Sequence, residues 1–136
     1  MSKKSLPHPT GAELELLRVL WERGPSTVRE IHEVQGEEKK TGYTTTLKIL
    51  QKMTDKGLVR RDASERSHVY EAACQAEETQ RQLVRDLLHR AFGGTPGQLV
   101  VQALSEEPAS AEELAKIRQM LDELEARQTK RGRRTQ

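Results

Sequence analysis

The sequence predicts a mainly α-helical protein with a small β-hairpin, and three observations support this fold class. Apolar residues recur at three- and four-residue spacing before residue 57 and again after residue 76, which is the period of amphipathic helices. Threonine or serine followed three residues later by glutamate marks several helix starts, and glycine marks several helix ends. Residues 58–62 and 68–72, two short runs on either side of a polar tip, predict the hairpin between the two helical parts.

Three helices are expected before the hairpin, at about residues 11–22, 28–36 and 42–56. The first two begin at capping boxes, pairs in which each side chain binds the partner's backbone amide: Thr10 with Glu13, and Thr27 with Glu30. Gly57 ends the third helix, because glycine readily adopts the left-handed conformation found after a helix C-terminus. Polar residues 37–41 form a loop before the third helix. Three helices followed by a hairpin form a winged helix-turn-helix.

Three more helices are expected after Cys74. Gly93-Gly94 ends the first of them, the second restarts at Thr95-Pro96, and Ser110 with Glu113 caps the last. Each helix carries a stripe of apolar residues, and these stripes need a partner surface against which they can be buried. The chain is therefore expected to consist of a disordered N-terminus, a winged helix-turn-helix domain, a helical domain and a basic disordered tail, at residues 1–9, 10–73, 74–127 and 128–136.

The composition excludes several classes of protein. Although 32% of the residues are charged, the net charge is only +2, so the chain lacks the strong self-repulsion of disordered proteins. One Trp, two Tyr and one Phe are too few for a platform that stacks unpaired bases, which leaves duplex DNA or a protein as the expected partner. No apolar run reaches the length of a membrane span, so we expect a soluble cytoplasmic protein without membrane insertion.

The residues that catalysis or metal binding would require lack their partners. A single cysteine, Cys74, can make neither an internal disulfide nor a multi-thiolate metal site. His32-Glu33 begins like a zinc-protease motif, but Gly36 stands where the second histidine is needed. Neither a nucleophile elbow nor a phosphate-binding loop occurs. We therefore expect no enzyme, no cofactor and no metal, while an oxidant-sensing thiol and an inert thiol both remain open for Cys74.

The small net charge conceals a basic block. From Lys39 to Arg61 there are seven lysines and arginines and one acid, Asp55. Within this block, a rotation of about 100° per residue divides the third helix into two faces. One face is expected to point away from the core and carries Thr44, Thr45, Lys48 and Lys52. The other is expected to face the core and carries Tyr43, Thr46, Leu47, Leu50 and Met53.

The outward face suits a helix that enters the major groove of DNA with its N-terminus first. Threonine can donate to or accept from base edges, and lysine can reach guanine acceptors or phosphates. We expect base contacts from Thr44, Thr45 and Lys48. Phosphate contacts are expected from Thr41, Lys52, Arg60, Arg61 and Arg66. Tyr43 is also expected to contact DNA and completes the DNA-binding set.

A solvated helix surface would explain such a face more simply. However, three consecutive threonines lower helix propensity, and a surface helix without a binding function usually carries Ala, Glu or Gln. Winged helices also serve as protein-docking modules, so a protein-interaction adaptor without DNA readout is the alternative function. An adaptor would expose apolar or mixed charged residues on this helix. The hydroxyl and ammonium groups therefore favour DNA.

Three motifs point to a known family. They are ELELLRVLW at residues 13–21, GYTTTLKILQKM at 42–53 and DKGLV at 55–59, with Tyr70 in the second wing strand. From about Leu6 to Glu125 the chain resembles the penicillinase-repressor family, of BlaI/MecI type with copper-responsive CopY relatives. The resemblance implies a homodimeric winged-helix repressor of palindromic operators. It also implies a dimer interface on the C-terminal helices, whose apolar residues include Leu83, Leu87, Leu88, Leu99, Leu114, Ile117, Leu121 and Leu124.

The resemblance further implies a mode of regulation. In penicillin-responsive members, a membrane-linked sensor protease system is associated with cleavage of an Asn-Phe bond in the dimerisation region. The corresponding bond here is Gln102-Ala103, and both residues differ from that pattern. The paired Cys-x-Cys motifs of copper-responsive members are absent from this sequence, which argues against copper sensing. Cleavage would release DNA by separating two DNA-binding domains, since a linked pair binds two half-sites more tightly than one domain binds one.

Overall fold

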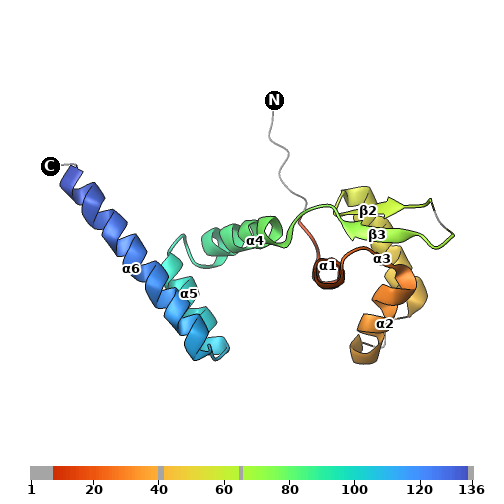
Figure 1. Ribbon diagram of the computed structural model, residues 1–136, viewed down its shortest axis with the longest axis horizontal. Helices are drawn as coiled ribbons and strands as arrows, with labels where there is room; N and C mark the ends of the chain where they lie inside the picture. The colour runs from red at the N-terminus through yellow and green to blue at the C-terminus, as the bar shows by residue number, and fades with distance from the viewer. Residues whose placement is uncertain (1–7, 40–41, 65, 135–136) are drawn as a thin grey trace. The chain divides into compact units, whose positions relative to one another are not determined.

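The computed structural model describes residues 8–39, 42–64 and 66–134 (Figure 1). Its elements, in chain order, are α1 (Gly11–Arg23), β1 (Ser26–Thr27), α2 (Val28–Lys39), α3 (Tyr43–Lys56), β2 (Val59–Asp62), β3 (Val69–Ala72), α4 (Ala76–Ala91), α5 (Pro96–Glu106) and α6 (Ala111–Arg134). The chain divides into two compact units, an N-terminal unit (Met1–Leu87) and a C-terminal unit (Leu88–Gln136). The predicted fold class, mainly helical with a small sheet and a winged helix-turn-helix, is confirmed.

The helix starts of the N-terminal unit follow the local sequence. The Glu13 amide donates to Thr10 Oγ1 at 3.2 Å, and the Thr10 amide donates to Glu13 Oε1 at 2.9 Å. Thr27 and Glu30 make the same reciprocal pair at the start of α2, also at 3.2 and 2.9 Å. Both predicted capping boxes are therefore confirmed, and each satisfies amides that a helix start leaves unpaired.

A three-stranded antiparallel sheet completes the N-terminal unit, with strand order β1-β3-β2. The predicted hairpin is confirmed, and its register pairs Arg61 with Tyr70 and Arg60 with Glu71. The short strand β1 was not predicted, because two residues are too few to show an alternating pattern. Gly24, at φ 87°, turns the chain after α1 and brings Ser26 opposite Tyr70. A helix can then begin directly after β1.

The hydrophobic core lies among α1, α2, α3 and the sheet. Its fully or almost fully buried side chains are Leu16, Leu17, Leu20, Val28, Ile31, Leu50, Met53, Leu58, Val59 and Tyr70. The indole N–H of Trp21 donates to the Cys74 carbonyl at 2.9 Å, which ties the chain leaving the sheet to α1. Gly57, left-handed at φ 82°, ends α3 as predicted and directs the chain into β2. The core therefore holds α3 and the wing in one rigid arrangement.

An ion pair joins the first turn of α1 to the last turn of α3. Lys56 Nζ lies 2.6 Å from Glu13 Oε1, and the Glu13 side chain is only 5% exposed. Burial raises the pKa of Glu13, but hydrogen bonds from Lys56 and the Thr10 amide, together with the charge of Lys56, outweigh it and leave the pKa below 4.5. The ionised form is thus favoured in the folded protein.

Two helices extend further than the sequence predicted. The backbone of α2 continues to Lys39, where a loop was expected from residue 37, because glutamate and lysine are good helix formers that offset one internal glycine. Similarly, α6 continues to Arg134 through most of the expected disordered tail, 128–136, because basic side chains stabilise a helix C-terminus. Most of the expected disordered N-terminus, residues 1–7, and the last two tail residues, 135–136, lie outside the described residues.

The C-terminal unit contains the last residues of α4, together with α5 and α6. Gly93 and Gly94, both with positive φ, end α4 as predicted, and Ser110 with Glu113 forms the predicted capping box. Among the described residues, every buried hydrophobic side chain belongs to the N-terminal unit. The helices of the C-terminal unit therefore leave large apolar side chains in solvent: Val100, Val101, Leu104, Leu114, Met120, Leu121 and Leu124. No helix in the described ranges is long and apolar enough to cross a membrane.

The Glu13–Lys56 pair predicts a pH-dependent stability. Because the pKa of Glu13 is lowered by folding, its contribution is complete above the unfolded pKa near 4.5 and is lost as pH falls through the folded pKa. Glu13→Gln, which removes the charge and keeps a capping side chain, should lower the free energy of unfolding by about 1 kcal/mol at pH 7. Urea unfolding at pH 7 and pH 3.5 measures this loss, which should be smaller at the lower pH because protonation of Glu13 removes the charge that the substitution removes. Glu33→Gln, at an exposed site on α2, is the matched control, and an equal loss from Glu13→Gln at both pH values would contradict the prediction.

Candidate nucleic-acid interface

Helix α3 has one face in the core and one in solvent. Thr46, Leu50 and Met53 are fully buried, and this burial fixes the rotation of the helix about its axis. The opposite face is exposed and carries the four residues that the sequence placed there: Thr44, Thr45, Lys48 and Lys52. The run of three threonines is therefore divided by the helical period, with two hydroxyls in solvent and the third in the core.

The third threonine is paired within the helix. Thr46 Oγ1 donates to the Gly42 carbonyl at 3.4 Å, so its buried hydroxyl has an acceptor. Gly42 is also the N-cap of α3, with an extended backbone at φ −72° and ψ 154°. Because glycine has no side chain, the N-cap residue cannot cover the first amides of the helix, and they can bind an anion. Thr41, which was expected to contact phosphate, lies outside the described residues.

Tyr43 lies in a different place from the one that helical periodicity predicted. It was expected to face the core, but the residue is 48% exposed. Its ring makes an edge contact with the His32 ring of α2, with centroids 5.9 Å apart and planes at 78°. Tyr43 is the first residue of α3, and its ring lies against α2 rather than in the core cluster.

The wing arginines lie on opposite faces of the sheet. Residues opposite one another in antiparallel strands share a face, so Arg61 lies on the face of Tyr70 and Arg60 lies on the face of Glu71. Arg60 Nε is 3.3 Å from Glu71 Oε1, which neutralises part of its charge. Arg61 and Arg66 are exposed. Arg60 and Arg61, which were both expected to contact phosphate, therefore point to opposite faces of the wing.

The wing loop, residues 63–68 with residue 65 outside the described part, begins at a local turn. The Ser64 amide donates to Asp62 Oδ1 at 2.9 Å. Hydrogen bonds from the Ser64 hydroxyl and amide lower the pKa of Asp62. These contacts hold the carboxylate at the end of β2, and they fix where the loop leaves the sheet.

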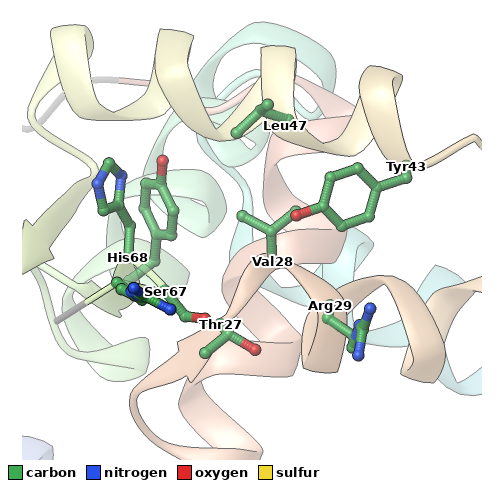
Figure 2. A pocket seen from close by; sticks show the side chains of 9 residues that line it. Thr27, Val28, Arg29, Tyr43, Leu47, Ser67 and His68 are labelled. Carbon is green, nitrogen blue, oxygen red and sulfur yellow. The ribbon is translucent and has the colours of Figure 1, made fainter. Parts of the chain in front are cut away.

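A pocket of about 460 Å³ lies between α3, the start of α2 and the wing (Figure 2). Figure 2 shows Tyr43 and Leu47 reaching from α3 toward the start of α2, and Ser67 and His68 lie on a further side. The lining residues come from α2, α3, β3 and the chain next to them: Thr27, Val28, Arg29, Tyr43, Leu47, Arg66, Ser67, His68 and Tyr70. Sequence reasoning missed Arg29 and His68, because neither lies on the helix or in the basic block that it considered.

The residues expected at a dimer interface lie on α4, α5 and α6. Leu87, Leu114, Leu121 and Leu124 are exposed, whereas the other four are half-buried: Leu83, Leu88, Leu99 and Ile117. Further exposed apolar residues on the same helices were not selected from the sequence, namely Val84, Val100, Val101, Leu104 and Met120. Val84 and Met120 lie three and four residues from selected positions, which was the available signal for these two.

Two other residues singled out from the sequence have defined surroundings. The Gln102-Ala103 bond lies inside α5, and Gln102 Nε2 donates to Glu106 Oε1 at 2.9 Å. The thiol of Cys74 lies 3.2 Å from Thr79 Oγ1 and is half-buried. Among the described residues, no three His, Cys, Asp or Glu side chains gather as metal ligands.

Comparison with known proteins identifies the family. The model of the penicillinase repressor family matches residues 9–123. The transcriptional regulator BlaI of Mycobacterium tuberculosis (strain ATCC 25618 / H37Rv) is 32% identical over 108 residues, covering 79% of this chain and 78% of that protein. The penicillinase repressor of Bacillus licheniformis is 23% identical over 120 residues, covering 88% and 94%.

A solved structure shares the fold. A complex structure of hsRosR-S4 has a TM-score of 0.52 at 18% identity, covering 90% of this chain and 94% of that chain. The solution structure of the DNA-binding domain of the repressor BlaI has a TM-score of 0.49 at 22% identity, covering 57% and 93%. The matched family consists of repressors and not of enzymes. This chain therefore belongs to the penicillinase-repressor family, whose members are DNA-binding transcriptional repressors with a winged-helix fold.

Proposed function

We propose that this repressor acts in the cytoplasm as a homodimer on palindromic operators, with the outward face of α3 in the major groove. The observation that carries the proposal is the exposure of Thr44, Thr45, Lys48 and Lys52 on a helix whose opposite face is buried. A helix fixed in this way can present its side chains to base edges without first ordering them, which lowers the entropic cost of binding.

The residues of this face have different roles in the proposal. Thr44 and Thr45 are short side chains near the helix start, where a recognition helix comes closest to base edges, and Lys48 reaches guanine acceptors. Lys52, one turn further on, and the wing residues Arg61 and Arg66 bind phosphates. Arg60 contributes less, because Glu71 already neutralises part of its charge.

The dimer in this proposal forms through α4, α5 and α6. Val101 is 67% exposed, Met120 61% and Leu121 52%, which leaves apolar area in water that a second copy can cover. A symmetric dimer would bury the same patch on both subunits and would present two α3 helices to two half-sites. Dimerisation thereby raises the affinity for a palindrome without any new contact to DNA.

Proteolysis is the proposed route by which repression ends, with a membrane-linked sensor protease as the partner. Protease active sites bind extended chain, so cutting at Gln102-Ala103 requires α5 to unwind around that bond. Because α5 carries part of the exposed apolar surface, a cut there would weaken the dimer and leave α3 unchanged. Each separated subunit would then bind a single half-site of the operator weakly.

The cleavage proposal predicts defined fragments. Mass spectrometry of the protein recovered from induced cells should show two fragments that meet between residues 102 and 103. Gln102→Arg, which changes the residue before the cut and keeps a good helix former inside α5, should give an intact chain and persistent repression under the same induction. An intact wild-type chain in fully derepressed cells would refute the cleavage proposal.

DNA recognition is tested with two α3 variants in one titration. Lys52→Ala should lower the slope of log K against log salt concentration by about 1, because one phosphate contact is lost. Thr45→Ala should keep that slope and reduce the ratio of specific to random duplex affinity about tenfold, because a base contact is lost. Fluorescence anisotropy with operator and scrambled duplexes measures both quantities.

Lys116→Ala on α6 is the control for Lys52→Ala, since it removes the same charge from an exposed helix position in the C-terminal unit. Equal slopes for the two variants would show that Lys52 does not contact phosphate. Wild-type binding that is absent or insensitive to salt would favour the protein-interaction adaptor instead.

The dimer is tested on α6. Leu121→Glu should convert the protein to a monomer and lower operator affinity by about a hundredfold, because a charge would be buried at the interface and avidity would be lost. Sedimentation equilibrium measures the first effect, and anisotropy with a full palindrome measures the second. Gln119→Glu, an exposed neighbour on the same helix, is the matched control and should remain dimeric. A dimeric Leu121→Glu variant would remove this surface from the proposal.

A further inference from the structure

We propose that two copies of this chain pair through α6 in antiparallel directions, with Glu113 of each subunit forming an ion pair with Arg127 of the partner subunit. This inference rests on the proposed dimer and deepens it, because it assigns the direction, the register and the charged contacts of the pairing. The partner is a second copy of the chain, and the surface is the exposed apolar side of α6 with its flanks.

The apolar residues of α6 form one short stripe that is symmetric about its middle. Its four residues follow one another at spacings of three, four and three: Leu114, Ile117, Leu121 and Leu124. Ile117 is half-buried and the others are exposed. Because this spacing is the same in both directions, an antiparallel partner helix can place its Leu124 against Leu114 and its Leu121 against Ile117. A parallel partner would match the stripe equally well, so the apolar residues alone do not set the direction.

The charges on either side of the stripe favour the antiparallel direction. Residues 106–113 contain four glutamates and no lysine or arginine: Glu106, Glu107, Glu112 and Glu113. Residues 126–134 contain five lysines and arginines and no acid: Arg127, Lys130, Arg131, Arg133 and Arg134. In a parallel pair, like-charged ends would meet. In an antiparallel pair with a two-fold axis, each acidic end lies beside the basic end of the partner subunit.

Glu113 and Arg127 lie on the same flank of the stripe. A rotation of about 100° per residue places both of them on one side of the stripe, together with Met120. Each is seven residues from Met120, one before it and one after it. Corresponding flanks meet in an antiparallel pair, so the axis that brings Met120 against its own copy also brings Glu113 against Arg127 of the partner subunit. The pairing would also cover Met120, which is 61% exposed in one chain.

Contacts within one chain do not account for these two charges. Arg127 makes no ion pair among the described residues, although Glu123 lies one turn before it. The helix dipole favours cations only in the last turn, and Arg127 lies seven residues before Arg134, where α6 ends. Glu113 accepts from the Ser110 amide at 3.3 Å through Oε1. Since a carboxylate has two acceptor oxygens, Glu113 can keep this cap and also bind an arginine.

The opposite flank of the stripe carries a residue whose effect depends on the direction of pairing. Arg118 is exposed on that flank. In an antiparallel pair it lies opposite its own copy near the axis, whereas a parallel pair would place it beside Glu113 of the partner subunit. Removing the charge of Arg118 should therefore strengthen an antiparallel dimer and weaken a parallel one.

The first test measures the dimer dissociation constant of full-length charge variants by sedimentation equilibrium. Arg127→Glu should weaken the dimer about tenfold, because two ion pairs become like-charge pairs. Lys130→Glu is the matched control, since it makes the same change of charge near the same helix end but on the side away from the stripe, and it should have little effect. Arg118→Gln should strengthen the dimer about threefold. A weaker dimer for Arg118→Gln, or equal effects of Arg127→Glu and Lys130→Glu, overturns the antiparallel pairing.

The second test measures the direction of pairing with spin labels. Three single-cysteine variants are prepared in a Cys74→Ser background, at exposed positions seven residues apart on the outer side of α6: Glu112→Cys, Gln119→Cys and Ala126→Cys. In the antiparallel dimer, the two labels are offset along the helix by about 20 Å at positions 112 and 126 and lie almost level at position 119. Double electron–electron resonance should therefore give the shortest distance at position 119. Equal distances at all three positions would show parallel pairing and refute the inference.

The outcomes distinguish this inference from the proposed dimer on which it rests. A wild-type chain that remains monomeric in sedimentation equilibrium refutes both. A wild-type dimer with equal label distances, or with its shortest distance at position 112 or 126, refutes the antiparallel register and leaves the dimer of the proposed function in place. A wild-type dimer with the shortest distance at position 119, weakened by Arg127→Glu and strengthened by Arg118→Gln, supports both.

Discussion

Burial of one face of α3 is the constraint on which the rest of the structure depends. Thr46, Leu50 and Met53 are inaccessible to solvent, and a helix with a fixed period of 3.6 residues can bury that face in only one rotation. The same rotation exposes Thr44, Thr45, Lys48 and Lys52. The end of α3 is equally determined, since the Leu58 amide donates to the Met53 carbonyl at 2.9 Å and the chain then enters the wing. The proposed binding surface is thus a consequence of how the core is packed.

Charge pairing elsewhere in the fold makes the outward face of α3 stand out as a region of unpaired positive charge. Several basic groups away from the outward face of α3 have acidic partners, as Lys56 does with Glu13 and Arg23 does with Glu30. The basic groups around that face are without such partners within the described residues: Arg29, Lys48, Lys52, Arg61 and Arg66. A net charge of +2 therefore understates the field that a polyanion would meet near α3. Pairing elsewhere also stabilises the fold that holds these groups in place.

The buried apolar side chains of the described residues lie in the N-terminal unit. The N-terminal unit has its own core and can hold a binding surface rigid, whereas the helices of the C-terminal unit leave leucines, valines and a methionine in solvent. Such a surface is costly to expose and is normally covered in the working assembly. In the proposed function, DNA recognition and subunit association therefore belong to different helices, so a cut in α5 would change affinity without altering α3.

The sequence by itself determined the features that depend on neighbours within four residues. These include both capping boxes of the N-terminal unit, the stop at Gly57 and the two faces of α3, because helix periodicity and end signals are local. Contacts between distant residues were decided only by the tertiary structure. Glu13 meets Lys56 across 43 residues, Ser26 pairs with Tyr70, and Tyr43 turns toward α2 rather than into the core. Arg29 and His68 reach one pocket for the same reason, since no local pattern records which side chains a fold brings together.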